Sequence, residues 1–298
     1  MKSLARIFHV ALAEWAGAVR SRRALVLLLL YLVAAVMCMY GTISIFSKME
    51  TELAQVLQLP EAEQTGVVSK TLWKSKPFRK MTRAVIRNDL VFRDIEGRHP
   101  IELVYAWFVF LCAPLLVVLV AGNRVADDLR SGAVRYAIVR CTRTEWSVGK
   151  YVGQALMLVC ALATSAVGAW VVALCRLSDA GALLPAMFDW GARAWIYSLA
   201  WLGVAMGISH LTRTGSRATA LGIFAVAALT ALPTILSWTG ARFDLPWLVN
   251  FDLVSPVTSK ILLWRQDVAP LAEASFRLVL LGIFYLALGN AAFRRRDA

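Results

Sequence analysis

The chain has 298 residues, of which 59% are hydrophobic and only 17% are charged. With a mean hydropathy of +0.63, this composition excludes an ordinary soluble domain and indicates an integral membrane protein. The chain is also basic, with 32 Lys and Arg residues against 19 Asp and Glu residues. Cationic loops beside a membrane explain this charge better than nucleic-acid binding does, so no nucleic-acid partner is expected.

Residues 1–23 are predicted to form an amphipathic helix. Apolar residues recur there at helical spacing among charged residues, as in a helix that lies in the plane of the membrane interface. The residues assigned to this interfacial helix are Glu14, Trp15, Arg20, Arg22 and Arg23. A helix that packs against the protein's own bundle is the alternative, and the two interpretations do not exclude each other.

Six apolar segments follow that are long enough to cross a bilayer as helices, which takes about 20 residues. Their predicted ranges are 24–46, 103–121, 151–175, 194–211, 218–238 and 275–293. The sequence therefore predicts an all-α integral membrane protein that forms one polytopic domain over residues 1–298. None of the six segments carries an acidic or basic residue in its middle, which disfavours an ion-coupled transporter.

The loops between these segments indicate the topology. Basic residues gather before the first segment, between the second and third, and at the C-terminal end, so the positive-inside rule predicts that both termini are cytoplasmic. Residues 47–102 then form an extracytoplasmic loop, in which ten Lys and Arg residues accompany eight acidic ones. We expect one or two amphipathic helices there, as a folded spacer or as a surface for an extracytoplasmic partner or the substrate.

Residues 122–150 form the predicted cytoplasmic loop between the second and third spans. A short amphipathic helix is expected in it, loosened at Gly132. Thr142 and Glu145 match a capping box directly before the third apolar segment, which would start that span at the membrane surface.

No catalytic, cofactor-binding or metal-binding residue is predicted in this chain. Ser209 and His210 are adjacent, so on a helix they point about 100° apart and do not form a catalytic dyad. The sequence contains no HExxH motif of a zinc-dependent protease. It also lacks the ATP-binding motif GxxxxGK[ST], since Gly149-Lys150 is followed by Tyr151 and not by Ser or Thr. A pumping activity would therefore need an energy source on another chain.

The cytoplasmic loop resembles the signature of the permease subunits of type-2 ATP-binding-cassette (ABC-2) exporters. The matching positions are Asp127 or Asp128, Gly132-Ala133-Val134, Ile138-Val139, Cys141 with Arg143, and Gly149-Lys150. The chain is also similar to this family in Glu14 followed by Arg20-Ser-Arg22-Arg23, in Ser255-Pro256, and in the ending Phe293-Arg-Arg-Arg-Asp297.

This resemblance implies a mechanism and a set of partners. The loop would contain a coupling helix that docks on a separate ATPase subunit, which would bind ATP and magnesium, while this chain would hold no cofactor. The implied coupling residues are Asp127, Asp128, Arg130, Gly132, Arg140 and Arg143. A second permease chain, identical or different, would lie beside this one in the bilayer of the bacterial inner membrane.

The resemblance also implies short re-entrant helices within residues 239–271, and it leaves the substrate open. A function from another class stays as the alternative: a non-transporting scaffold or anchoring subunit of a multiprotein complex. Its basic loop would bind a protein other than an ATPase, or anionic lipid.

Overall fold

A computed structural model of the chain describes residues 2–57, 73, 76–86, 88–177, 180–244, 251 and 253–295. Every regular element within these residues is a helix, which confirms the all-α fold. In chain order the elements are α1 (Lys2–Arg20), α2 (Arg22–Leu57), α4 (Lys76–Ile86), α5 (Asp89–Ile95), α6 (Pro100–Ala121), α7 (Arg124–Ser131), α8 (Ala133–Ile138), α9 (Arg143–Arg176), η2 (Ala180–Ala182), α10 (Leu183–Leu211), α11 (Gly215–Phe243), α12 (Pro256–Lys260), η4 (Ile261–Trp264) and α13 (Val268–Arg294).

Six helical stretches of the described chain are long and apolar enough to span a membrane, and each contains one predicted segment. They are Arg22–Lys48, Pro100–Ser131, Arg143–Arg176, Ala180–Leu211, Gly215–Gly240 and Val268–Arg294. The prediction of an integral membrane protein with six spanning helices is confirmed.

Most of these helices are longer than the apolar segments from which they were predicted. The helix α2 has 36 residues, which corresponds to about 54 Å, whereas the hydrocarbon core is about 30 Å thick. It therefore continues into the predicted loop 47–102. Similarly, α9 begins at Arg143 inside the predicted loop 122–150, and α10 begins at Leu183, well before residue 194.

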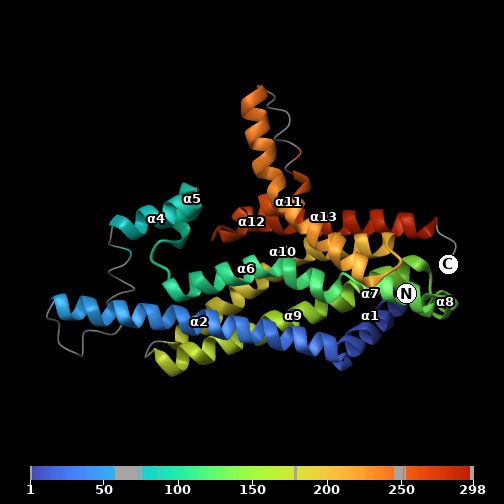
Figure 1. The fold of residues 1–298 in the computed structure, drawn as a ribbon, viewed down its shortest axis with the longest axis horizontal. Coiled ribbons are helices and arrows are strands. Elements are labelled where there is room, and N and C mark those ends of the chain that lie inside the picture. Colours follow the sequence, from blue (N-terminus) through green and yellow to red (C-terminus); the bar gives the residue numbers. More distant parts are fainter. Residues whose placement is uncertain are drawn as a thin grey trace.

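The helices form an elongated bundle with two distinct ends (Figure 1). Five of the apolar helices (α2, α6, α9, α10 and α13) run along its length. Both chain ends lie at one end of the bundle together with α7 and α8, and we call this the terminal end. The helices α4 and α5 lie at the opposite end, which we call the far end. This placement of the chain ends agrees with an even number of spans.

Glycines let α10 and α13 come into backbone contact. A Cβ atom on Gly203 of α10 would lie 2.1 Å from the carbonyl oxygen of Gly282 on α13, and one on Gly207 would lie 2.6 Å from that of Tyr285. Gly207 and Gly289 also face each other, since a Cβ on Gly289 would lie 2.5 Å from the Cα of Gly207. The Gly203-x-x-x-Gly207 spacing therefore joins helices within one chain.

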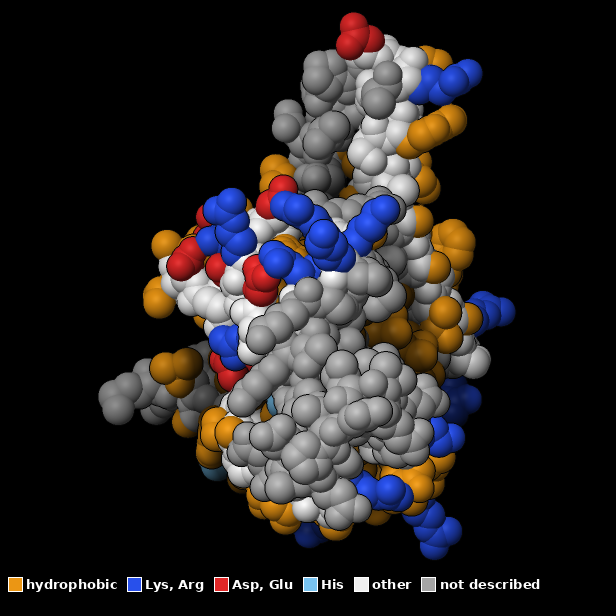
Figure 2. Space-filling model, turned by 90° about the vertical axis from the view of Figure 1, so that its left-hand side faces the viewer, with side chains coloured by type: hydrophobic (Ala, Val, Ile, Leu, Met, Phe, Trp, Pro, Cys, Tyr) orange, Lys and Arg blue, Asp and Glu red, His pale blue; other side chains and the backbone are white. Residues whose placement is uncertain are grey.

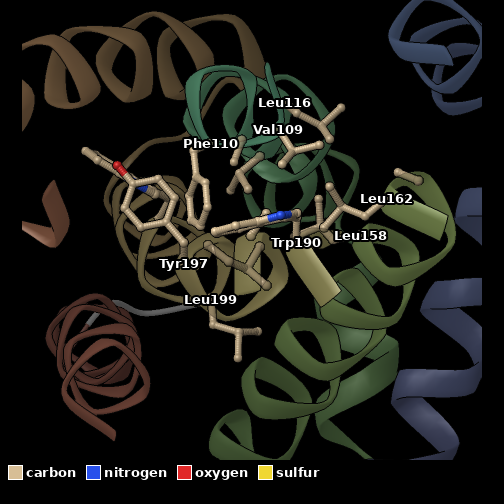
Figure 3. Close-up of a cluster of buried hydrophobic side chains, with 14 of the residues drawn as sticks. Val109, Phe110, Leu116, Leu158, Leu162, Trp190, Tyr197 and Leu199 are labelled. Atoms are coloured by element: carbon tan, nitrogen blue, oxygen red, sulfur yellow. The ribbon is translucent and has the colours of Figure 1, made fainter. Parts of the chain in front are cut away.

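Aromatic side chains fill the centre of the bundle between α6, α9 and α10 (Figure 3). Phe110 packs edge-on against Trp190 and Tyr197, with ring centroids 6.4 and 5.7 Å apart. Leu158 and Leu162 of α9 are buried in the same cluster (Figure 3). Large rings in contact with aliphatic side chains give this interior its packing.

The helix α11 leaves the bundle and projects from it (Figure 1). It contains Pro233, which cannot donate a backbone hydrogen bond to the carbonyl of Leu229. The hydroxyl of Ser255 donates to that carbonyl instead, at 2.6 Å, and it also accepts from the backbone N–H of Val257 at the start of α12. One serine thus replaces the helical bond lost at the proline and begins the next helix.

Candidate functional site at the terminal end of the bundle

The predicted loop 122–150 contains two short helices, α7 and α8, in place of the single helix that we expected. Gly132 separates them with φ 73°, a left-handed conformation that a residue with a side chain rarely adopts. Gly132, one of the implied coupling residues, is therefore the corner between α7 and α8.

The capping box predicted at the start of the third span is confirmed. The backbone N–H of Glu145 donates to the Thr142 hydroxyl at 3.2 Å, and the backbone N–H of Thr142 donates to the Glu145 carboxylate at 2.8 Å. Arg6 of α1 lies 3.6 Å from the same carboxylate. The first turn of α9 thus has its free amides satisfied and already contacts α1.

A buried ion cluster joins α1, α7 and α9, and we call it the Lys150 clamp. The Lys150 ammonium lies 2.5 Å from the Glu14 carboxylate of α1 and 2.7 Å from the Asp128 carboxylate of α7. The side-chain amide of Gln154 donates to Glu14 at 2.6 Å, and the Trp146 ring lies 5.2 Å from the ammonium. Only 5% of the Lys150 side chain is exposed, so its charge is satisfied within the protein.

Close helix packing surrounds the clamp. A Cβ atom on Gly149 would lie 2.6 Å from the Cβ of Val10, and one on Gly153 would lie 2.7 Å from the carbonyl oxygen of Ala11. The two glycines one turn apart on α9 therefore allow α1 to approach near enough for Glu14 to reach the Lys150 ammonium.

Asp127 and its neighbours attach α7 to two further spans. The side-chain amide of Asn123 donates to Asp127 at 2.5 Å, and a Cβ atom on Gly215 would lie 2.3 Å from the same carboxylate. Asp127 thus lies against the first residue of α11, where the helix dipole favours a negative charge. The backbone N–H of Ala126 donates to the Ser209 hydroxyl of α10 at 3.0 Å.

Arg143 joins the start of α9 to the end of α13. Its guanidinium donates to the carbonyl of Phe293 at 3.1 Å and to that of Arg294 at 3.3 Å, and it stacks on the Phe293 ring. These are carbonyls at the end of a helix, where a cation is favourable. Arg294 in turn donates to the hydroxyl of Thr144 at 2.5 Å.

His210 has a hydrogen-bonding partner that the sequence did not suggest. Its Nδ1 lies 2.6 Å from the carbonyl of Met206 and must donate to it, so Nε2 accepts the hydroxyl proton of Ser147 at 2.9 Å. Both side chains are completely buried between α9 and α10. The pair has the composition of a nucleophile and a base, but both side chains are enclosed between two packed helices.

The outward surface of α7 and α8 combines cations with apolar side chains. Tyr136 and Val139 are 82% and 85% exposed, the largest values among the exposed large apolar residues of the described chain. Arg130 of α7, Arg135 of α8 and Arg140, which follows α8 directly, are also exposed. We call this set of five the α7–α8 surface. Exposed apolar side chains among cations are typical of a protein-docking surface.

The helix α1 packs against the bundle on one side, as the second sequence interpretation expected, and exposes an apolar stripe on the other. One side packs on α9 through Ala11 and the clamp residue Glu14, and Trp15 is partly buried. The other side exposes Leu4, Phe8 and Leu12 at intervals of four residues, a stripe suited to lipid. The basic residues near its end are exposed: Arg20, Arg22 and Arg23.

The predicted residues thus fall into two groups. Glu14, Asp127, Asp128, Gly132 and Arg143 make contacts within the chain, whereas Arg130 and Arg140 face outward with Arg20, Arg22 and Arg23. Sequence reasoning missed Lys150 as an ion-pair partner. A lysine directly before an apolar run is a signal of a buried or snorkelling cation, but its two partners lie on other helices.

The far end holds a second buried charge. Arg193 of α10 donates to the carbonyls of Leu263 and Arg265 at 2.9 and 2.8 Å, and lies 2.9 Å from the Asp189 carboxylate. A bilayer core spans about 20 helical residues, so counting back from Leu211 puts Arg193 near the other membrane boundary. It fastens η4, with its neighbour α12, to the bundle. The two short helices lie where the resemblance implied re-entrant ones.

Comparison with known families identifies a transporter family. The sequence profile described as "ABC-2 family transporter protein" covers residues 8–298, and thus includes all six candidate spans. A comparison with curated proteins finds no match.

Proposed function

Since this chain belongs to the ABC-2 family of transporter proteins, whose members are membrane-spanning transport permeases, we propose that it is the permease subunit of an ATP-driven exporter. Its working site would be the α7–α8 surface, on which a separate ATPase subunit docks. ATP and magnesium would be bound by that subunit, and the terminal end of the bundle would face the bacterial cytoplasm.

The observation that carries this proposal is the number of spans fixed to α7. The helix is joined to α9 through Lys150, to α10 through Ser209 and to α11 through the contact of Asp127 with Gly215. A displacement of α7 by a docked partner is therefore transmitted to three apolar helices at once, since packed helices move as rigid units. That is what a permease without its own energy source requires.

The chemistry of the α7–α8 surface indicates the complementary surface on the ATPase. Tyr136 and Val139 need an apolar recess, and the three exposed arginines (Arg130, Arg135 and Arg140) need carboxylates around it. Aromatic residues and arginines contribute most to the affinity of such interfaces.

We also propose a second permease chain, identical or different, as part of the assembly. Two pairs of glycines with G-x-x-x-G spacing already contact helices of the same chain: Gly149 and Gly153 pack against α1, and Gly203 and Gly207 pack against α13. Exposed apolar faces remain for a second copy on several spans, among them α2 with Leu29, α11 with Phe224 and α13 with Ile283.

The proposal is tested by co-expressing the tagged chain with an ABC ATPase, which the proposal expects to be encoded beside it. The wild type should retain the ATPase through purification, and Tyr136→Ser with Val139→Ser should weaken retention at least tenfold, because two buried apolar contacts are lost. The matched control is Arg213→Gln with Arg217→Gln, two exposed residues near the same end of the bundle, which should retain it. A wild-type chain that retains no ATPase would favour the scaffold alternative.

A further inference from the structure

The proposed function makes no use of the basic helices at the far end. Residues 76–98 contain seven basic and three acidic residues. Basic residues normally gather on the cytoplasmic side of a membrane protein, where the termini of this chain are expected. This concentration at the opposite end needs another explanation.

The helix α4 carries its charges along one face. Lys76, Arg79, Lys80 and Arg83 are spaced three or four residues apart, which puts them side by side on a helix, and all four are exposed. Ile86, at the end of the same helix, is buried. Figure 2, which faces the far end, shows Lys and Arg side chains gathered there with acidic ones among them.

Contacts within the segment hold this face in place without neutralising it. Arg79 pairs with Glu96 at 2.8 Å and Arg83 with Asp89 at 2.6 Å, and both guanidinium groups stack on the ring of Phe92. These exposed pairs are weak in water. Lys76, Lys80 and Arg93 are exposed and pair with no acidic residue in the described part of the chain.

Chain connectivity keeps the segment close to the membrane. The helix α5 ends at Ile95 and the spanning helix α6 begins at Pro100, and Gly97 turns the chain between them with φ 87°. Four linking residues reach at most about 14 Å. The end of α5 therefore lies within about 14 Å of the start of α6, close to the lipid headgroups that surround this end of the span.

Contacts of Asp94 fix the segment to the spanning part, and a contact of Trp73 fixes the linker before α6. The Asp94 carboxylate of α5 accepts from Arg265 at 2.6 Å and from the backbone N–H of Gln266 at 3.2 Å, both next to η4. The indole N–H of Trp73 donates to the carbonyl of Arg98 at 2.8 Å. The basic face is thus held rigidly beside the point where α6 enters the bilayer.

From this geometry we propose that α4 and α5 form a binding surface for anionic phospholipid headgroups in the leaflet at the far end. Phosphate groups of that leaflet lie close to the cationic face, and a row of lysine and arginine side chains matches their charge. Lys76, Lys80 and Arg93 supply the unpaired cations, and Arg79 and Arg83 exchange their weak carboxylate partners for phosphate. The proposal depends on the membrane fold and not on the transport function.

The test measures lipid selectivity of the full-length chain in bilayers, from the association of spin-labelled phosphatidylglycerol relative to spin-labelled phosphatidylcholine. The wild type should prefer phosphatidylglycerol, and the preference should fall as salt is raised. Lys76→Gln with Lys80→Gln should lower it by about fivefold for each cation removed. Lys76→Arg with Lys80→Arg should preserve it, because the charge is kept.

The matched control removes two exposed cations from the terminal end outside the α7–α8 surface, as Arg213→Gln with Arg217→Gln, and should leave the preference for phosphatidylglycerol unchanged. An equal loss in this control, or no loss in the Lys76 and Lys80 variant, would overturn the proposal. So would a wild-type chain without preference for phosphatidylglycerol, and binding of an acidic protein at this surface would then become the better explanation.

Discussion

Replacing Lys150 with methionine tests the Lys150 clamp directly. Methionine has nearly the length of lysine and keeps the packing, but it removes the ammonium that Glu14 and Asp128 share at 2.5 and 2.7 Å. Two carboxylates would then lose their cation. We expect Lys150→Met to destabilise the junction of α1, α7 and α9.

The size of the effect follows from the burial of the three groups. Removing one partner of a buried ion pair costs about 3–5 kcal/mol, because an uncompensated charge remains. The Asp128 side chain is 33% exposed and can be hydrated, whereas that of Glu14 is 12% exposed and keeps only the hydrogen bond from Gln154. We therefore expect the lower value, about 3 kcal/mol.

Thermal unfolding of the purified chain in detergent provides the assay. At about 2 °C for each kcal/mol in a chain of this size, Lys150→Met should lower the unfolding temperature by about 6 °C. The control is Arg176→Met, which removes an exposed cation from the same helix. The Arg176 guanidinium donates a hydrogen bond to the Tyr40 hydroxyl. Its effect should stay below about 1 kcal/mol.

A double variant separates the clamp from general damage. In Lys150→Met with Glu14→Gln, the uncompensated carboxylate is gone, so stability should recover in part relative to Lys150→Met alone. The reasoning is refuted if Lys150→Met is no less stable than Arg176→Met. It is refuted equally if the effects of the two clamp substitutions simply add.

Three other substitutions probe separate joints of the bundle. Ser255→Ala should lower the free energy of unfolding by about 1–3 kcal/mol, because it leaves the carbonyl of Leu229 unbonded beside the proline of α11; denaturant titration measures it, and Ser255→Thr should restore most of the loss. Gly149→Val should push α1 away from α9, since a Cβ atom would lie 2.6 Å from that of Val10; faster proteolysis within α1 would show this, and an unchanged rate would contradict the close packing. Arg193→Met should leave two carbonyls near η4 without a donor and cost about 2 kcal/mol or more, measured by thermal unfolding.

Local patterns in the sequence were sufficient for the parts of the fold that depend on neighbouring residues. The capping box of Thr142 and Glu145 involves residues three apart, and the structure contains both of its hydrogen bonds. The six apolar segments were found because a spanning helix must be apolar over its whole length. Gly132 marked the corner between α7 and α8 through its conformational freedom.

Contacts between distant residues could not be predicted from one sequence. Lys150 and Glu14 are 136 residues apart, and nothing local tells which carboxylate a lysine will reach. Gly149 and Gly153 are spaced one helical turn apart, which favours close helix packing, but nothing local in the sequence indicates that α1 is the partner. Helix ends were also missed, because α10 continues from residue 194 back to Leu183 past two charged residues, Asp189 and Arg193, which interrupt the apolar segment.

The central claim is that this chain couples membrane transport to an ATPase docked on the α7–α8 surface. Its most direct test is the rate of ATP hydrolysis by the neighbouring ATPase in proteoliposomes, measured with the wild-type chain and with the variant Tyr136→Ser with Val139→Ser. We predict that the wild-type chain recruits the ATPase to the membrane and changes its rate of hydrolysis, and that the variant does neither. Equal recruitment and equal rates with both chains would contradict the claim.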